Sequence, residues 1–314
     1  MIKILITGGA GNIGGSLAEK LSQNEDYYVV VVDNLLTGSL DKLPYPTPDN
    51  FKFIKCDVNN YNDLSAVMLA YKFDYVFHYA AMVGVKRTLN NPMGVLQDIE
   101  GIKNILSLSK NTAVKRVFFS SSSEVYGEPV EFPQNEHTTP LNSKLPYAIV
   151  KNVGEAFFKS YQKEYGLDYT IFRFFNTYGP RQSKDFVVSK FIEAAMNNRD
   201  ITIYGDGFQT RTFCYIDDNI DATIKIFEDG NFVNEVINIG SAREVSILEL
   251  ANLVIKITGS SSKIIHLEAL KEGDMTRRQP DNSKMKQILQ RDLTSIEKGI
   301  KNIINIHFNS LVHS

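Results

Sequence analysis

The chain has 314 residues, of which 43% are hydrophobic and 22% charged, and its formal net charge is −2. This length can bury a large core, and the composition is that of an ordinary globular protein rather than a small disulfide-stapled scaffold. The balanced charge, with no long basic run, gives no reason to expect a nucleic acid or an acidic membrane as a partner.

Cysteine and histidine usage gives no sign of a metal site. Cys56 and Cys214 lie far apart and match no ligand spacing, and the five histidines are scattered. We therefore expect reduced thiols, a cytoplasmic protein and no structural metal. The chain begins directly with MIKILITGG, so we expect no signal peptide, and no apolar run approaches the length of a membrane span.

Short apolar runs alternate with helical-period segments along the first 175 residues. The runs suit strands buried on both faces, and they cover residues 2–6, 29–32, 51–54, 75–77, 117–119 and 169–174. Helices are expected at 13–22, 92–109 and 147–165. This alternation predicts an α/β fold with a Rossmann-type doubly wound parallel sheet over residues 1–175.

The pattern changes after Phe175. Loops rich in Gly, Pro and Asn follow, with one helical segment near 187–197 and the turn-rich TIYGDGFQTRTF. We predict a smaller C-terminal α/β subdomain over residues 176–314, from which a segment near 213–240 returns to the sheet domain.

A glycine-rich turn, TGGAGNIGG, directly follows the first expected strand. Gly9, Gly11 and Gly14 satisfy G-x-G-x-x-G, which lets a backbone approach a dinucleotide pyrophosphate at a helix N-terminus. Glycine turns are common, so this pattern alone is weak. Asp33 follows at the end of the second strand, where a carboxylate accepts both ribose hydroxyls and repels a 2'-phosphate. The combination predicts NAD rather than NADP.

The segment LPYAIVKN places Tyr147 and Lys151 four residues apart. On a helix this spacing puts both side chains on one face. The ammonium can then stabilise the phenolate and lower the phenol pKa from about 10. Tyr and Lys at this spacing also occur on many helices without a catalytic role, so the pair needs a partner.

Such a partner is found in FFSSSSEVYG, residues 118–127, where an apolar run ends in four serines and a glutamate. The carboxyl end of a parallel strand faces the ligand crevice of such folds. A serine there can hydrogen-bond the substrate hydroxyl that Tyr147 deprotonates, so a Ser, Tyr and Lys set could drive hydride transfer to nicotinamide. Serines at a strand end also cap the following turn, and we expect that role for Ser120 and Ser121.

Motifs along nearly the whole chain together resemble the extended short-chain dehydrogenase/reductase family, the NAD-dependent sugar-nucleotide epimerases and dehydratases. They occur in the family's order: TGGAGNIG, DNLLTG, CDV, HYAA, SSSEVYG, YAIVK, RFFNTYGPRQ, TIYGDGFQTRTFCYIDD, INIGS and EGDMTRRQPD. The resemblance implies an NAD-binding domain over 1–175 and a nucleotide-sugar-binding subdomain over 176–314. It also implies a homodimer formed through the helices near 92–109 and 147–165.

The resemblance further implies roles for individual residues. The catalytic residues are Ser122, Tyr147, Lys151 and Glu124. The cofactor-binding residues are Gly8, Gly11, Asn12, Ile13, Gly14, Asp33, Asn34, Asp57, Val58, Tyr79, Ala80, Ala81 and Lys151. The substrate-binding residues are Ser123, Asn176, Tyr204, Arg211 and Arg278. An arginine fork matches the oxygens of a nucleotide diphosphate.

Four positions depart from the family pattern. Asn12 stands where an aromatic residue is common, and Val83 stands where galactose-type epimerases have a lysine. Asp98 replaces a usual asparagine and Ile102 a usual threonine, which changes the hydrogen bonding expected near the site.

The reaction subclass depends on Ser123 and Glu124. Ser123 lacks the acid of thymidine-diphosphoglucose dehydratases, whereas the Ser-Glu pair is similar to that of UDP-glucuronate decarboxylases and GDP-mannose dehydratases. We expect oxidation of the C4 hydroxyl of a nucleotide-diphosphate sugar, for cell-surface polysaccharide synthesis, ending in epimerisation or net dehydrogenation. Dehydration or decarboxylation with Glu124 as C5 base stays open. A non-catalytic NAD-sensing module is disfavoured because the Ser, Tyr and Lys set is retained. The sequence names neither the sugar nor the nucleotide.

Overall fold

A computed structural model describes residues 1–128, 130–268 and 278–312, with side chains for all of these except 85, 86 and 307–312. The chain forms two compact units. The first contains residues 1–127, 140–174 and 223–237, and the second contains 128–139, 175–222 and 238–314. The segment that returns to the first unit is thus shorter than the 213–240 of the sequence analysis.

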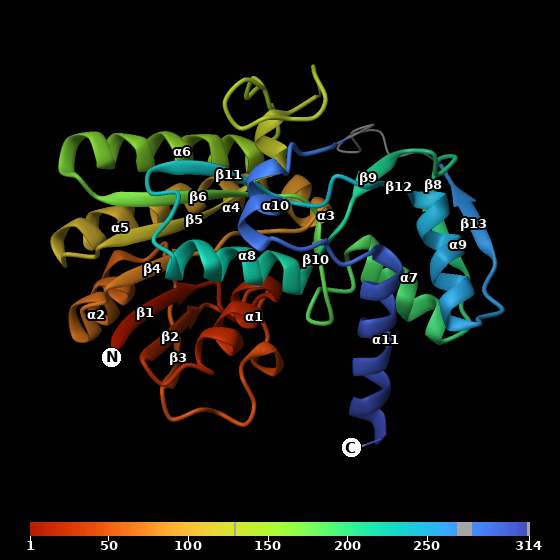
Figure 1. Cartoon of the computed structure of the whole chain (residues 1–314), viewed down its shortest axis with the longest axis horizontal. Coiled ribbons are helices and arrows are strands. Elements are labelled where there is room, and N and C mark those ends of the chain that lie inside the picture. Colours follow the sequence, from red (N-terminus) through yellow and green to blue (C-terminus); the bar gives the residue numbers. More distant parts are fainter. Residues whose placement is uncertain (129, 269–277, 313–314) are drawn as a thin grey trace. The chain divides into compact units, whose positions relative to one another are not determined.

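The first unit is built on a sheet in which seven described strands have the order β11-β6-β5-β4-β1-β2-β3 (Figure 1). These strands are β1 (Ile2–Thr7), β2 (Tyr27–Asp33), β3 (Phe51–Lys55), β4 (Tyr75–His78), β5 (Arg116–Ser122), β6 (Asp168–Phe174) and β11 (Glu235–Ile239). Strands β1 to β6 pair in parallel. The chain order reverses on either side of β1, which is the switch point of a doubly wound sheet. The predicted Rossmann-type fold is confirmed.

Helices connect these strands. They are α1 (Asn12–Leu21), η1 (Leu40–Lys42), α2 (Tyr61–Tyr71), α3 (Val85–Asn90), α4 (Pro92–Leu96), α5 (Asp98–Asn111), η2 (Ser123–Tyr126) and α6 (Pro146–Tyr165). The single helix expected over 92–109 is wrong, because it is divided at Gln97. There the Glu100 amide donates to the Gln97 carbonyl three residues back, at 3.0 Å, and this tighter turn separates α4 from α5.

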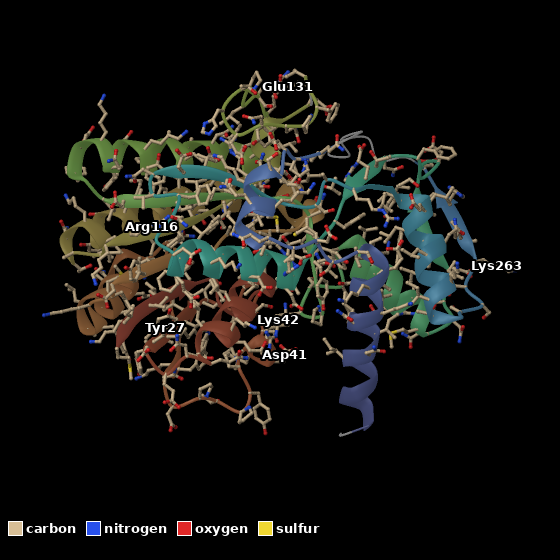
Figure 2. The ribbon with its side chains drawn as sticks, in the orientation of Figure 1. Tyr27, Asp41, Lys42, Arg116, Glu131 and Lys263 are labelled. Carbon is tan, nitrogen blue, oxygen red and sulfur yellow. The ribbon has the colours of Figure 1, made fainter. Side chains whose placement is uncertain are left out.

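The sheet is covered on both faces, as its continuous apolar strands require. On one face, Leu5, Val76 and Val117 pack in a core cluster that also contains residues of α2, α5 and α6, and Figure 1 shows α5 and α6 side by side. On the other face, the ring of Phe227, at the end of α8 (Ile216–Glu228), meets several strand aromatics. One of these is Tyr27, labelled in Figure 2, whose ring centroid lies 5.6 Å from that of Phe227.

The second unit combines short strands with helices. Its strands are β7 (Thr177–Tyr178), β8 (Ile201–Tyr204), β9 (Thr210–Thr212), β10 (Cys214–Tyr215), β12 (Glu244–Ser246) and β13 (Ile264–Leu267). Its helices are α7 (Val187–Met196), the first part of α8, α9 (Ile247–Thr258), α10 (Ser283–Leu289) and α11 (Ile296–Val312). The strands pair as β7 with β10, β8 with β13, and β9 with β12. Residues 272–277 of the EGDMTRRQPD motif lie outside the described residues.

Candidate active site

Most of the residues assigned to a cofactor or to catalysis lie at the carboxyl ends of parallel strands in the first unit. Strand β1 ends just before Gly8, β2 ends at Asp33, β4 ends just before Tyr79, and β5 ends at Ser122. Because the carboxyl ends of parallel strands meet at one edge of a sheet, these residues share an edge, and ligands of such folds bind beyond it.

Around the junction of β1 and α1, a Cβ at Gly8 or at Gly14 would collide with backbone atoms. Gly8 has φ +69°, and a Cβ there would lie 2.6 Å from the Ala80 backbone nitrogen. A Cβ on Gly14 would lie 2.5 Å from the Gly8 carbonyl oxygen. The turn is therefore packed tightly against the end of β4 and against its own helix. Helix α1 begins after Gly11, which offers no capping side chain, and its first turn holds no acidic residue.

Asp33 is held in one orientation by two backbone amides. Its Oδ2 accepts from Ala10 N at 3.0 Å and its Oδ1 accepts from Leu35 N at 2.8 Å. The residue is only 9% exposed. Next to it, the exposed Asn34 accepts from Leu36 N at 3.0 Å. Each Asp33 oxygen keeps further acceptor capacity.

The ends of β3 and β4 carry the other residues assigned to the cofactor. Asp57 Oδ1 accepts from Asn59 N at 3.0 Å, and the Val58 side chain packs in the core cluster. Ala80 N donates to Thr7 Oγ1 at 3.1 Å, and Ala81 is half-buried. The Tyr79 ring packs edge-on against two phenylalanines, and burial raises the pKa of its phenol. The Tyr79 side chain therefore faces the protein interior, which leaves its backbone for any ligand.

The carboxyl end of β5 differs from the sequence expectation in the roles of its serines. We call residues 122–124, where β5 passes into η2, the strand tip. Ser120 Oγ donates to the His78 carbonyl at 3.3 Å, and Ser121 Oγ donates to Glu155 Oε1 at 2.6 Å. The turn-capping role predicted for these two serines is thus wrong, since neither bonds the following turn through these contacts. Ser122 Oγ instead accepts from Glu124 N at 3.2 Å. Ser123 is buried and Glu124 is half-buried.

Tyr147 and Lys151 lie on the same face of α6, which packs against both β5 and η2. Lys151 Nζ lies 5.6 Å from the centre of the Tyr147 ring and 3.5 Å from Ser120 Oγ. The Lys151 side chain is 2% exposed. Burial lowers the pKa of Lys151 to about 8, and the Asp98 charge opposes this shift. A positive charge thus sits beside the phenol that the sequence assigns as base.

Asp98, one of the departures from the family pattern, is half-buried, and each of its carboxylate oxygens accepts a hydrogen bond. Its Oδ2 accepts from Met82 N at 2.7 Å and its Oδ1 from Asn59 Nδ2 at 3.4 Å. Burial raises the pKa of this carboxyl, while the Met82 amide and the Lys151 charge act against the rise. A carboxylate here therefore adds a negative charge that acts on Lys151, which an asparagine would not do.

His78 stays neutral beside this group. Burial, together with the Lys151 charge, lowers the pKa of His78 to about 3. Its Nδ1 lies 2.9 Å from Thr7 Oγ1. Because that oxygen already accepts from Tyr79 N and Ala80 N, the hydroxyl proton goes to Nδ1.

The residues assigned to the nucleotide diphosphate belong to the second unit. Asn176 has φ +30°, and its Nδ2 donates to the Thr212 carbonyl at 3.0 Å. This contact brings Asn176 next to the segment of β9 that carries Arg211. Arg211 pairs with Val245 of β12. Tyr204 ends β8, and Arg278 is 6% exposed.

Comparison with known proteins decides the family. A profile of the NAD dependent epimerase/dehydratase family matches residues 4–240. The chain belongs to this family. A UDP-N-acetyl-alpha-D-glucosaminuronate decarboxylase of Bacillus cytotoxicus is 37% identical over 96% of both chains. A putative UDP-glucose 4-epimerase of Methanocaldococcus jannaschii is 33% identical over 96% of this chain and 97% of the relative.

A solved structure agrees with this assignment. The crystal structure of UDP-glucose 4-epimerase with UDP-glucose from Thermotoga maritima matches with a TM-score of 0.92. It is 33% identical in sequence, and the match covers 99% of this chain and 100% of that one. The protein is accordingly an enzyme of an NAD-dependent family, as the sequence motifs predicted.

The residues present in this chain fit NAD. The turn at Gly8 and Gly14 excludes any Cβ, the N-terminus of α1 offers amides and positive potential to a pyrophosphate, and Asp33 presents a fixed carboxylate. Asn12 opens α1, and its side-chain oxygen is buried with no hydrogen-bond partner within the described part of the chain. Ile13, next to it, is half-buried.

Sequence reasoning missed two buried charged residues of this chain, Glu155 and Arg173. Both are 1% exposed and they pair with each other beside the strand tip. One signal was available, since Arg173 interrupts the apolar run of a strand that is otherwise buried, and a buried arginine requires a partner.

Within residues 1–128, 130–268 and 278–312, no group of three or more His, Cys, Asp or Glu side chains is placed to hold a metal ion. In the same described ranges, no helix combines the length and the apolar character needed to cross a membrane.

Proposed function

We propose that this enzyme oxidises the C4 hydroxyl of a nucleotide-diphosphate sugar and that the reaction ends in C4 epimerisation or net C4 dehydrogenation. The observation that carries this proposal is the buried Lys151 ammonium beside the Tyr147 ring, on a helix that packs against the strand tip. A base, a charge that stabilises it and a hydroxyl donor are the groups needed to remove a proton from an alcohol while a hydride leaves.

NAD is held, in this proposal, by the first unit. The α1 N-terminus at Gly11, Asn12 and Ile13 receives the pyrophosphate, and Asp33 with Asn34 receives the adenosine ribose. Further residues complete the site around the adenine and the nicotinamide: Asp57, Val58, Tyr79, Ala80, Ala81 and Lys151. NAD, when bound, supplies the acceptor for the hydride that leaves C4.

Tyr147 takes the proton of the C4 hydroxyl in this scheme. Its phenolate is stabilised by Lys151, whose ammonium lies within Coulombic range in a buried environment where charges interact strongly. Ser122 orients the hydroxyl by a hydrogen bond from its Oγ, which already accepts from Glu124 N. When the ketone is reduced again from the other face, Tyr147 returns the proton and the epimer forms.

The second unit binds the nucleotide diphosphate in this proposal, through Asn176, Tyr204, Arg211 and Arg278. Ser123 contacts the sugar from the first unit. The relatives described above are named for UDP sugars, so a UDP sugar is the substrate class we propose. We also propose that the enzyme is a cytoplasmic homodimer that serves cell-surface polysaccharide synthesis.

Decarboxylation is the second candidate, and two observations favour it. Glu124 is half-buried at the strand tip. Once C4 is a ketone, a C6 carboxylate can leave as carbon dioxide, its bonding electrons entering the C4 enolate, and a carboxyl group at this place could then return a proton to C5. The Bacillus cytotoxicus relative is named as a decarboxylase. Ser123 supplies no acid for the departure of a C6 hydroxyl, which makes 4,6-dehydration the weaker form of this alternative.

The deciding experiment is a panel of UDP-glucose, UDP-glucuronate and their N-acetylated counterparts, incubated in heavy water with the enzyme and NAD. Nuclear magnetic resonance identifies a C4 epimer, and mass spectrometry identifies loss of carbon dioxide or water. We expect a C4 epimer or a C4 ketone with no solvent deuterium on carbon. Deuterium at C5, lost in a Glu124→Gln variant that still oxidises C4, would establish the second candidate instead. No change in any sugar would refute both.

A further inference from the structure

A buried ion pair adjoins the strand tip in the first unit. Arg173 donates from Nε to Glu155 Oε1 at 2.9 Å and from Nη2 to Glu155 Oε2 at 2.7 Å. This two-point contact fixes direction as well as distance. It joins α6, which carries Glu155, to β6, which carries Arg173.

Each member of the pair also contacts one side of the strand tip. Glu155 Oε1 accepts from Ser121 Oγ at 2.6 Å, one residue before the tip begins. Arg173 Nη1 donates to the Tyr126 hydroxyl at 2.9 Å, and its guanidinium carbon lies 4.8 Å from the centre of the Tyr126 ring. Ser121 and Tyr126 therefore bracket residues 122–124 from both ends.

Glu155 lies on α6, the helix that also carries Tyr147 and Lys151. It follows Lys151 by one turn and Tyr147 by two, so the three side chains lie on one face of α6. The preceding residue, Gly154, allows the helix to approach β5 closely, because a Cβ there would lie 2.6 Å from Phe119 Cζ. The carboxylate thus joins the two elements where their backbones come close.

We propose that Glu155 and Arg173 are positioning residues for the reaction put forward above, on which this inference rests. They set the strand tip, with Ser122, at a fixed distance from the α6 face that carries Tyr147. Reacting groups lose rate steeply when they are displaced by fractions of an ångström. A buried ion pair adds little net stability over apolar residues of similar volume, and orientation accounts for its place here.

The test is a charge-balanced double variant of the full chain, Glu155→Gln with Arg173→Met, assayed with NAD and the nucleotide sugar. Removing both charges leaves no unpaired charge in the interior, so we expect the variant to fold. We expect kcat to fall by about 10- to 100-fold. The KM for the sugar and the Kd for NAD should each change by less than about threefold, because orientation acts on the reacting groups rather than on binding.

A matched control lies near the amino-terminal ends of β5 and β6, away from the strand tip. Arg116, labelled in Figure 2, is a second buried arginine, and its Nε donates to Thr170 Oγ1 at 2.9 Å. Thr170→Val removes this partner far along the strands from the tip. We expect a lower melting temperature with unchanged kcat in this control.

Hydrogen exchange of the peptide covering residues 120–127 gives a readout that needs no substrate. We expect faster exchange there in the double variant and no change in the control. If the double variant does not fold, Ser121→Ala keeps the ion pair, removes its bond to β5, and should lower kcat by about 3- to 10-fold.

A folded variant with native kcat and native exchange would overturn the proposal, whether it is the double variant or Ser121→Ala. If the native enzyme converts no nucleotide sugar, the proposed function fails, while the exchange experiment still decides whether the pair positions the strand tip.

Discussion

Asp33→Asn tests how the enzyme chooses its cofactor. In the native protein both Asp33 oxygens accept backbone amides, so the carboxylate cannot turn away from an adenosine ribose placed beside it. A 2'-phosphate on that ribose carries a charge near −2. At a separation of about 5 Å and the dielectric constant of water, the two charges repel by ~1.7 kcal/mol.

This repulsion sets the expected selectivity. Each 1.4 kcal/mol is about a tenfold difference in Kd, so NAD should bind at least about tenfold tighter than NADP. The residue is 9% exposed, and partial burial strengthens the repulsion beyond its value in water. Asparagine removes the charge and leaves one acceptor oxygen for the two amides. We therefore expect the ratio of the two Kd values to fall to about two or less.

The assay is calorimetric titration of NAD and NADP into native and variant protein at two salt concentrations. The variant loses one hydrogen bond, worth about 1 kcal/mol. This loss weakens the binding of both cofactors alike and therefore cancels in the ratio of their Kd values. The native selectivity should shrink at high salt because the repulsion is screened. Equal Kd values for the native protein, or an unchanged ratio in the variant, would refute the reasoning.

Three further changes test other parts of the site. Tyr147→Phe keeps the ring but removes the proton acceptor, so sugar-dependent reduction of NAD should slow by about 100-fold or more; an unaltered rate would move the base elsewhere. The Lys151 ammonium is lost as pH rises through its pKa of about 8, so kcat/KM should fall there. Asp98→Asn, which removes the charge that raises this pKa, should move that fall to lower pH; a shift to higher pH would contradict the assignment. Gly14→Ala places a Cβ 2.5 Å from the Gly8 carbonyl oxygen and should lower the free energy of unfolding by about 1–3 kcal/mol. In Gly11→Ala the nearest atom to the new Cβ is at 3.1 Å, so denaturant unfolding should show a smaller loss of stability.

The sheet could be predicted from the sequence because each of its buried strands is a continuous apolar run. The run at 117–119 proved to be a strand from Arg116 to Ser122, because the serines that follow the run still pair with β6. Hydroxyls hide such an extension, since they read as turn residues. The prediction of a single helix over 92–109 was wrong because the apolar pattern continues through Gln97, where the observed backbone makes a tighter turn.

The glycine turn, Asp33 and the Tyr147–Lys151 pair carry local patterns that the sequence displays directly. The network around Glu155 has no such pattern. Its four members, Ser121, Tyr126, Glu155 and Arg173, are spread over 53 positions of the chain and come from four elements. Only the strand pairing and the packing of α6 bring them together, and no spacing rule encodes that. The effect of the Asp98 charge on the pKa of Lys151 likewise has no local sequence pattern.

The most direct test of the account is a single turnover of enzyme and NAD with a UDP sugar that carries deuterium at C4. The near-ultraviolet absorbance of the bound cofactor reports its reduction, and the same sugar with hydrogen at C4 is the reference. C4 oxidation predicts slower reduction with the deuterated sugar and deuterium recovered on the cofactor when the product is released as a ketone, or at C4 of the epimer. Reduction at equal rates with both sugars, or product that has lost the C4 deuterium to solvent, would contradict the central claim.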